Sequence, residues 1–358
     1  MAFEPNSMEL HPLAHLLTPS SVAVVGASED PASVGAALVR NLARSFAGTL
    51  WLVNPNRRQV HGRPAHRSIS ALPSVPELAV LATPPETIPG LIDECARQGV
   101  RAAAILSSGL STATREGRRA LQQISASAAR YHMRILGPNS LGVMRPALGL
   151  NATFAASAAR PGSVALVAQS GAMVAAVLDW ADADEVGFSS VVSLGNKLDV
   201  DFADVLDFLT LDPATDSIVL YVEGIRNARK FMSALRAAAR AKPVVVLKAG
   251  RDEAGSRAAA THTSSLAGRD DVVDVALRRA GAVRVKSFVQ LFSAAKCLSS
   301  RYRPVGNRLA VITNGGGPGV MAADRAGETG IELAQLSAAT RERLDRTLPP
   351  AWSRANPV

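Results

Sequence analysis

The first candidate for chemistry in this sequence is a histidine in a loop of small polar residues. His262 lies in the segment Thr-His-Thr-Ser-Ser-Leu-Ala-Gly, residues 261–268. An imidazole in these surroundings has few apolar side chains to pack against, which weakens a purely structural role. A histidine on a loop can act as a nucleophile and carry a phosphoryl group. The alternative is an ordinary structural or surface histidine.

Two other segments could complete a phosphoryl-transfer site. A phosphohistidine needs an acceptor that orients its second ring nitrogen, and Glu223, which follows a predicted strand over 218–222, is a candidate. Gln169, Ser170 and Gly171 open a predicted helix that has no acidic residue in its first turn. The free N–H groups and the dipole of that helix could bind the phosphate. A plain serine N-cap is the alternative.

A glycine-rich turn follows the first predicted strand. It runs from Gly26 to Gly35 and reads Gly-Ala-Ser-Glu-Asp-Pro-Ala-Ser-Val-Gly. Glycine allows the backbone to approach a phosphate, but Ser28 replaces the second glycine of the usual dinucleotide pattern and the loop is longer. The next strand ends in Asn54 and Pro55, without the acidic residue that binds the ribose in NAD proteins. A dehydrogenase is therefore disfavoured, and a nucleotide-type fold without a ligand stays open.

Further candidate cofactor contacts lie at the ends of neighbouring predicted strands. Arg57, next to Arg58, could pair with a ribose phosphate, or the two arginines could form a solvated turn. Proline gives a fixed edge without an N–H donor, so the segments Thr83-Pro84 and Pro138-Asn139 are expected to form rigid walls around a narrow ligand arm.

These residues need a scaffold of parallel strands. Short apolar strands are predicted at 22–25, 50–53, 78–82, 102–106 and 134–136, with helices between them. This alternation predicts an α/β fold, here a Rossmann-type domain over residues 1–145. Ligands of such sheets bind beyond the carboxyl ends of the strands, where all the turns named above lie.

The pattern starts again after a predicted linker at 145–161. Predicted strands at 164–167, 189–193, 218–222 and 244–247 indicate a flavodoxin-like, doubly wound domain over residues 146–303. A third start, with a strand at 309–312 and a helix at 320–326, leads us to expect an incomplete α/β domain over 304–358.

Composition disfavours several functional classes. The chain has 358 residues, 47% hydrophobic and 19% charged, which suits two or three packed domains. Its net charge of +9 permits polyanion binding, but the arginines are dispersed and no nucleic-acid signature is present, so no nucleic-acid partner is expected. No apolar run approaches the roughly 18–20 residues of a membrane span. We expect a cytoplasmic protein without a membrane partner.

Metal binding is not expected either. Cys95 and Cys297 lie far apart and predict neither a disulfide framework nor a metal cluster. The acidic stretch over 199–207 contains four aspartates, which suit the start of a helix and a solvated face better than a metal site.

The ordered set of motifs resembles the NDP-forming acyl-CoA synthetases, relatives of succinyl-CoA synthetase, specifically their alpha part. The resemblance runs from about Pro19 onward and is carried by these stretches: Ser21–Ser28, Val53–Pro55, Gly137–Asn139, Gln169–Gly171, Ser193–Asn196, Tyr221–Gly224 and Thr261–Thr263.

The resemblance implies a first domain that binds coenzyme A and a second domain that carries the active-site histidine. His262 would be phosphorylated, Glu223 would orient it, and the turn Gln169–Gly171 would cradle the phosphate. The implied reaction converts acyl-CoA, ADP and phosphate reversibly to carboxylate, CoA and ATP.

The sequence departs from the full pattern of that family because it has no ATP-grasp domain. ATP, ADP and Mg²⁺ are therefore expected only with an ATP-grasp beta subunit or domain, and the protein is expected to be an oligomer. Two alternatives stay open: an acyl-CoA-sensing regulatory part, as in GNAT-fused lysine acetyltransferases, and a CoA-binding module without catalysis.

Overall fold

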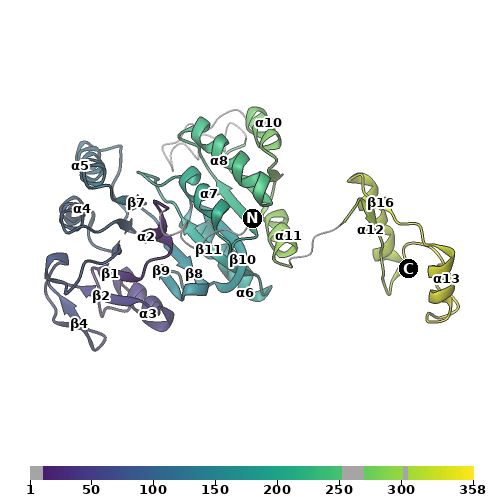
Figure 1. Ribbon diagram of the computed structural model, residues 1–358, viewed down its shortest axis with the longest axis horizontal. Coiled ribbons are helices and arrows are strands. Elements are labelled where there is room, and N and C mark those ends of the chain that lie inside the picture. The colour runs from purple at the N-terminus through teal and green to yellow at the C-terminus, as the bar shows by residue number, and fades with distance from the viewer. Residues whose placement is uncertain (1–10, 252–269, 301–304) are drawn as a thin grey trace. The chain divides into compact units, whose positions relative to one another are not determined.

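The computed structural model of the chain describes residues 11–251, 270–300 and 305–358. His262 and its loop lie outside the described residues. The chain forms two compact units, Met1–Arg301 and Tyr302–Val358, and each is described by itself. Figure 1 shows the first unit in purple to green and the second in yellow-green.

A seven-stranded sheet begins the first unit, with the order β3-β4-β2-β1-β5-β6-β7. Except for the antiparallel edge strand β3, all neighbours are parallel. If β4 is counted as the third strand, the order is 3-2-1-4-5-6, so the predicted Rossmann-type sheet is confirmed. The strands are β1 (Ser21–Val25), β2 (Thr49–Val53), β3 (Gln59–Val60), β4 (Arg63–His66), β5 (Leu78–Leu81), β6 (Ala102–Ile105) and β7 (Arg134–Leu136).

Helices cover both faces of this sheet because alternate residues of each strand point to opposite sides. Val22 and Val24 pack with α3 (Val34–Ser45). Ala23 and Val25 pack on the other face with α4 (Ile88–Arg97) and α5 (Arg115–Tyr131). Burial on both faces explains why the strands appear in the sequence as continuous apolar runs. Short 3₁₀ turns lie at Ile69–Ala71 and Pro85–Thr87.

The second sheet also has seven strands, in the order β14-β13-β12-β10-β11-β8-β9. Its parallel part has the order 2-1-3-4-5 when counted along the chain, so the predicted flavodoxin-like topology is confirmed. The strands are β8 (Gly142–Arg145), β9 (Leu150–Thr153), β10 (Arg160–Ala168), β11 (Gly187–Ser193), β12 (Ser217–Val222), β13 (Val244–Lys248) and β14 (Val283–Val285).

Helices again lie on both faces of the second sheet. Residues from α6 (Gly171–Ala183) and α11 (Phe288–Ser299) pack on one face. The other face packs with α7 (Phe202–Leu211) and α8 (Ala228–Ala241), and α10 (Asp270–Ala280) also contributes Leu277 to that core.

The linker expected at 145–161 is wrong. Strand β9 and the start of β10 lie within it, separated from β8 by a 3₁₀ turn at Pro146–Leu148. β8 and β9 are antiparallel and extend the second sheet. The segment looked like a linker because β9 contains two polar residues. Thr153 Oγ1 donates to Asn151 Oδ1 at 2.7 Å, and this internal hydrogen bond allows both side chains to be buried in the strand.

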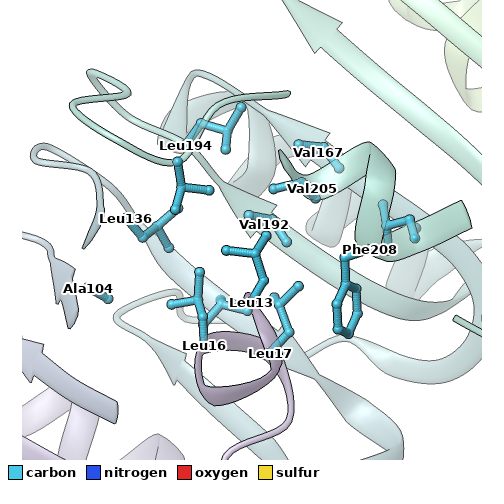
Figure 2. Close-up of a cluster of buried hydrophobic side chains, with 14 of the residues drawn as sticks. Leu13, Leu16, Leu17, Ala104, Leu136, Val167, Val192, Leu194, Val205 and Phe208 are labelled. Atoms are coloured by element: carbon cyan, nitrogen blue, oxygen red, sulfur yellow. The ribbon is translucent and has the colours of Figure 1, made fainter. Parts of the chain in front are cut away.

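One hydrophobic core joins the two sheets (Figure 2). It contains Leu13, Leu16 and Leu17 from the N-terminal segment with α2 (Ala14–Leu17), which the sequence analysis did not predict. These leucines are fully buried. They lie among residues of the first sheet, Ala104 and Leu136, and residues of the second sheet and its helices, including Val167, Val192, Leu194, Val205 and Phe208.

The second unit is small. β15 (Arg308–Leu309) and β16 (Glu332–Leu333) are parallel, with α12 (Gly316–Glu328) between them and α13 (Ala338–Asp345) after them. The strand expected at 309–312 is shorter than predicted, and the helix expected at 320–326 begins earlier. In neither unit do the described residues include a helix that is long and apolar enough to cross a membrane.

Gly35 fixes the start of α3 against the tip of β1. Ser33 caps this helix by accepting from Ala36 N at 3.2 Å. A Cβ at Gly35 would lie 2.0 Å from Gly26 O, so the helix can approach the strand only if this residue is glycine. Gly35, which the sequence predicts to lie at a cofactor site, thus has a packing role that is independent of any ligand.

Gly35→Ala is expected to destabilise the protein by roughly 1–3 kcal/mol because the added methyl group meets a backbone oxygen that cannot easily move. Urea unfolding monitored by circular dichroism measures this. Gly90→Ala is the matched control: Gly90 is an exposed helical residue with nothing within 4 Å of an added Cβ. It should gain about 0.5–1 kcal/mol. Equal effects of the two substitutions would contradict the account.

Candidate functional site

A cavity of about 700 Å³ lies at the carboxyl ends of strands from both sheets. The first sheet contributes residues that follow β5, β6 and β7, and the second contributes residues that follow β10, β11 and β12. Because parallel strands place their carboxyl ends at one edge, this is where a doubly wound sheet binds a ligand. The polar lining consists of Thr83, Ser107, Ser108, Asn139, Ser140, Gln169, Ser170, Asn196 and Glu223.

The N-terminus of α6 opens into this cavity. Gly171 and Ala172, the first helical residues, line it, and the first turn carries no acidic side chain. Ser170 is the N-cap, and its Oγ accepts from Met173 N at 3.4 Å. The first N–H groups of a helix have no partner within the helix, so this end offers backbone donors and the positive end of the helix dipole to an anion. Ser170 can therefore serve as a plain N-cap while the same helix end binds a phosphate, so both interpretations from the sequence are compatible with this geometry.

Gln169 connects the two switch-point strands of the second sheet. Its Oε1 accepts from Glu223 N at 2.7 Å and from Gly224 N at 2.9 Å. The side chain is nearly buried, with 5% of the residue exposed. The side-chain oxygen of Gln169 is thus engaged by the backbone after β12, a role that the sequence analysis did not predict.

Glu223 lines the cavity directly after β12 and is 9% exposed. Two residues earlier, burial and, to a smaller extent, the neighbouring Glu223 carboxylate together raise the pKa of Tyr221 to about 12. The phenol therefore stays protonated at neutral pH. Among the residues that the structure describes, Glu223 is the only one with an acidic side chain that lines this cavity.

The first-domain candidates divide into two groups. Thr83 and Asn139 line the cavity, whereas Gly26, Ser28, Gly35, Asn54, Pro55, Arg57, Pro84 and Pro138 are not among its lining residues. Gly26 lies immediately behind Thr83: it has φ +91°, and a Cβ there would lie 2.9 Å from Thr83 Cγ2. Glycine is required there both by the left-handed backbone and by this close approach.

Asn54 joins two turns of the first sheet. Its Nδ2 donates to Ala27 O at 2.8 Å, and its Oδ1 accepts from Asn56 N at 2.8 Å and from Arg57 N at 3.1 Å. The Arg57 guanidinium pairs with Glu29 at 2.5 Å, and both side chains are largely exposed. A ligand phosphate would therefore compete with Glu29 for Arg57.

Pro138 holds the two sheets together at the cavity. Its carbonyl oxygen accepts from Asn196 N at 2.8 Å. A Cβ at Gly195 would lie 2.3 Å from the same oxygen. The loop after β11 can therefore lie this close to Pro138 only because residue 195 is glycine. Gly195 has φ +57°, which glycine adopts without strain. The proline expected to form a wall of the ligand site thus also forms the junction between the sheets.

Several cavity residues were not among the sequence-based candidates. An apolar wall is formed by Leu106, Leu141, Phe154 and Ala175. Ser107 Oγ donates to Thr83 O at 2.6 Å and fixes the rim. Behind Glu223 lie two buried lysines, Lys197 and Lys248. Single apolar residues and isolated lysines form no recognisable sequence motif. Their positions around the cavity are therefore known only from the tertiary structure.

The acidic stretch begins a helix as expected from the sequence, but the expected solvated face is only partly found, since the Asp204 side chain is 11% exposed. Asp201 caps α7 in a capping box with Asp204, and Arg134 pairs with Asp199 at 2.8 Å and with Asp204 at 3.0 Å. Among residues 11–251, 270–300 and 305–358, no group of three or more potential metal ligands comes together.

Two family models match the chain. Residues 20–146 match a CoA binding domain, and residues 161–298 match a succinyl-CoA ligase like flavodoxin domain. The acetate–CoA ligase (ADP-forming) I of Archaeoglobus fulgidus is 41% identical over 97% of this chain, which spans 50% of that protein. The alpha subunit of acetate–CoA ligase (ADP-forming) I of Pyrococcus furiosus is 39% identical, over 97% of this chain and 76% of the subunit.

A solved structure agrees with these relatives. The dinucleotide-forming acetyl-coenzyme A synthetase 1 of Candidatus Korarchaeum cryptofilum, in complex with phosphate and ADP, matches with a TM-score of 0.91 and 37% identity. The match covers 97% of this chain and 75% of that one.

Gln169→Leu is expected to destabilise the protein because it leaves two buried N–H groups without an acceptor, at roughly 1–3 kcal/mol each. Gln290→Leu is the matched control, since Gln290 Oε1 accepts from Lys286 N at an exposed position. Urea unfolding of the two variants should show a large loss for the first and a small one for the second. If Gln169→Leu lowered the free energy of unfolding no more than Gln290→Leu does, the two hydrogen bonds of Gln169 would not be needed for stability.

Proposed function

Because the chain belongs to the family of ADP-forming acetate–CoA ligases, as a relative of their alpha part, we propose that it binds coenzyme A in its first domain and carries phosphoryl-transfer chemistry in its second. The resemblance identified from the sequence is confirmed by the two family models and by the alpha subunit of Pyrococcus furiosus. The comparisons give no support to the regulatory alternative.

The observation that carries the proposal is the shared cavity. It brings Thr83 and Asn139 of the CoA-binding domain together with Ser170, Gly171 and Glu223 of the second domain. A thioester held by the first domain would therefore end beside an anion-binding helix terminus and a carboxylate. These are the groups that phosphorolysis of a thioester and transfer to a histidine require.

The proposed reaction has three steps. An oxygen of inorganic phosphate attacks the thioester carbonyl, the C–S bond breaks, and the CoA thiolate leaves and takes up a proton. A ring nitrogen of His262 then attacks phosphorus of the acyl phosphate, the P–O bond to the acyl group breaks, and the carboxylate leaves. Finally, the phosphohistidine transfers its phosphoryl group to ADP, which regenerates the imidazole.

Each residue has a defined role in this scheme. The N–H groups at the start of α6, next to Ser170 and Gly171, hold the negative phosphate. The Glu223 carboxylate accepts from the second ring nitrogen of His262 and so presents the attacking nitrogen to phosphorus. Gln169 holds the backbone of Glu223 in place.

Coenzyme A would lie along the tips of the first sheet. The turn from Gly26 to Gly35 leads into the N-terminus of α3, and Val34 of that turn lines the cavity. We propose that this turn, with Ser28, Asn54 and Pro55, faces the nucleotide end, and that Arg57 exchanges Glu29 for a phosphate of CoA. Thr83, Pro84, Pro138 and Asn139 would flank the pantetheine arm.

We assign the nucleotide step to a part other than the two domains that the family models match. The chain spans about half the length of the Archaeoglobus fulgidus relative and about three quarters of the Pyrococcus furiosus alpha subunit. The Candidatus Korarchaeum cryptofilum structure contains ADP and phosphate. We propose that an ATP-grasp beta subunit or domain supplies ADP and Mg²⁺. The expected oligomer, the cytoplasmic location and the domain limits at 145 and 303 stay predictions.

Calorimetry with CoA, acetyl-CoA and NAD tests the first part of the proposal. We expect CoA and acetyl-CoA to bind and NAD to bind far more weakly, because the tip of β2 carries Asn54 in place of an acidic ribose ligand. Tighter binding of NAD than of CoA would contradict the proposal.

Labelling tests the second part. The chain is incubated with acetyl-CoA and ³²P-labelled phosphate, and we expect an acid-labile, alkali-stable label on the protein. His262→Asn should abolish it. His132→Asn is the matched control, since His132 is exposed and has φ +55°, a left-handed conformation that asparagine tolerates. Label that persists in His262→Asn would show that another residue carries the phosphoryl group.

A further inference from the structure

The backbone of Glu223 and Gly224 is held at all four of its hydrogen-bonding groups. Gln169 Oε1 accepts from both N–H groups, at 2.7 and 2.9 Å. Lys248 Nζ donates to Glu223 O at 2.8 Å, and Lys197 Nζ donates to Gly224 O at 2.6 Å. A two-residue segment at a strand end thus has every polar backbone atom paired with a side chain.

The two lysines are buried, with exposed fractions of 2% for Lys197 and 4% for Lys248. Burying an ammonium group costs free energy unless it is well paired. Among residues 11–251, 270–300 and 305–358, neither lysine has a carboxylate oxygen closer than 4.0 Å, the distance from Lys197 Nζ to Asp201. Replacing both lysines by apolar residues would be the simpler way to fill this space. Both ammonium groups instead donate to the backbone after β12, which points to a specific use for the two donors.

The backbone at Lys197 gives an independent indication. This residue has φ +54°, in the left-handed region that a non-glycine residue rarely adopts. Strained residues of this kind persist where the surroundings hold them and cluster at functional sites. Here the holding group is Arg226, whose Nη1 donates to Lys197 O. With this backbone conformation, the Lys197 ammonium group reaches Gly224 O in the segment that follows β12.

We infer that Lys197 and Lys248 are positioning residues that hold the Glu223–Gly224 backbone from behind and thereby fix the Glu223 carboxylate toward the cavity. The inference rests on the proposed role of Glu223 and goes beyond it, because neither lysine is among the residues that line the cavity. We call the two hydrogen bonds from Lys197 and Lys248 to this backbone the clamp. The clamp would affect the rate of transfer to His262 and would leave the affinity for CoA unchanged.

Lys197 also gives the clamp a pH dependence. Burial lowers the pKa of its ammonium group from 10.5 to about 8. The charged groups that act on it are Asp201 and Glu223, which raise this pKa, and Arg226 and Lys248, which lower it. The Phe202 ring lies 5.4 Å from Nζ. As the pH rises through about 8, the charge-assisted bond to Gly224 O weakens.

Stability changes in the opposite direction over the same pH interval. Between about pH 8 and 10.5 the unfolded chain still binds the proton that folded Lys197 has released. The contribution of this group to the free energy of unfolding therefore rises with pH, while its hold on Gly224 weakens. A purely structural lysine would not lower the transfer rate while stability from the same group increases.

The test measures the rate of ³²P labelling from acetyl-CoA and labelled phosphate for Lys197→Met and Lys248→Met. Each should label roughly 10- to 100-fold more slowly, the usual effect of losing a group that orients another from behind. CoA affinity by calorimetry should stay unchanged. Lys242→Met is the matched control: Lys242 Nζ also donates to two carbonyls, Leu209 O at 2.5 Å and Asp212 O at 2.6 Å, but before β13, at the opposite edge of the sheet. It should label at the wild-type rate.

The pH profile distinguishes positioning from simple packing. Wild-type labelling should decline above about pH 8, and Lys197→Arg should not show that decline because a guanidinium stays protonated. Equal labelling rates for Lys197→Met, Lys248→Met and Lys242→Met would overturn the inference, and so would an unchanged alkaline decline in Lys197→Arg.

Amide hydrogen exchange tests the clamp even if the proposed function fails. Exchange at Glu223 and Gly224 should be faster in Lys197→Met and Lys248→Met than in wild type, and unchanged in Lys242→Met. Unchanged exchange in all three variants would overturn the clamp. Absence of labelling in the wild-type chain, together with faster exchange in the two variants, would contradict the proposed function and leave the clamp standing.

Discussion

The structure depends on one shared hydrophobic core. The leucines of the N-terminal segment pack between Leu136 of the first sheet and Val192 and Phe208 of the second domain, so neither sheet buries its apolar face alone. Parallel strands end at a common edge, and fixing the two sheets to each other therefore fixes which strand ends meet. The cavity with Thr83, Ser170 and Glu223 is the consequence.

The sequence was informative where local patterns determine the structure. Strands such as β1 and β12 are apolar, rich in β-branched residues and have a glycine within two residues of their ends, so both doubly wound domains could be predicted. Strand β9 was missed because the paired polar side chains of Asn151 and Thr153 concealed a buried strand. The N-terminal helix was missed because a four-residue helix has too short a pattern and is stabilised by tertiary packing.

The candidate site was only partly predictable. Ser170 and Glu223, which the rule that ligands bind beyond strand ends singled out, both line one cavity, but the rule could not assign their neighbours. Asn54 and Gly35 have structural contacts that account for them without a ligand. Lys197 and Lys248 carry no signal in the sequence, because a lysine is usually exposed and only the assembled structure shows that these two are buried.

The most direct test of the account is a crystal structure of the chain with its proposed partner, coenzyme A and phosphate. The account predicts the CoA sulfur beside Thr83 and Asn139, phosphate at the N-terminus of α6, and the His262 imidazole donating to the Glu223 carboxylate. A thioester end bound outside this cavity, or an imidazole directed away from Glu223, would contradict it.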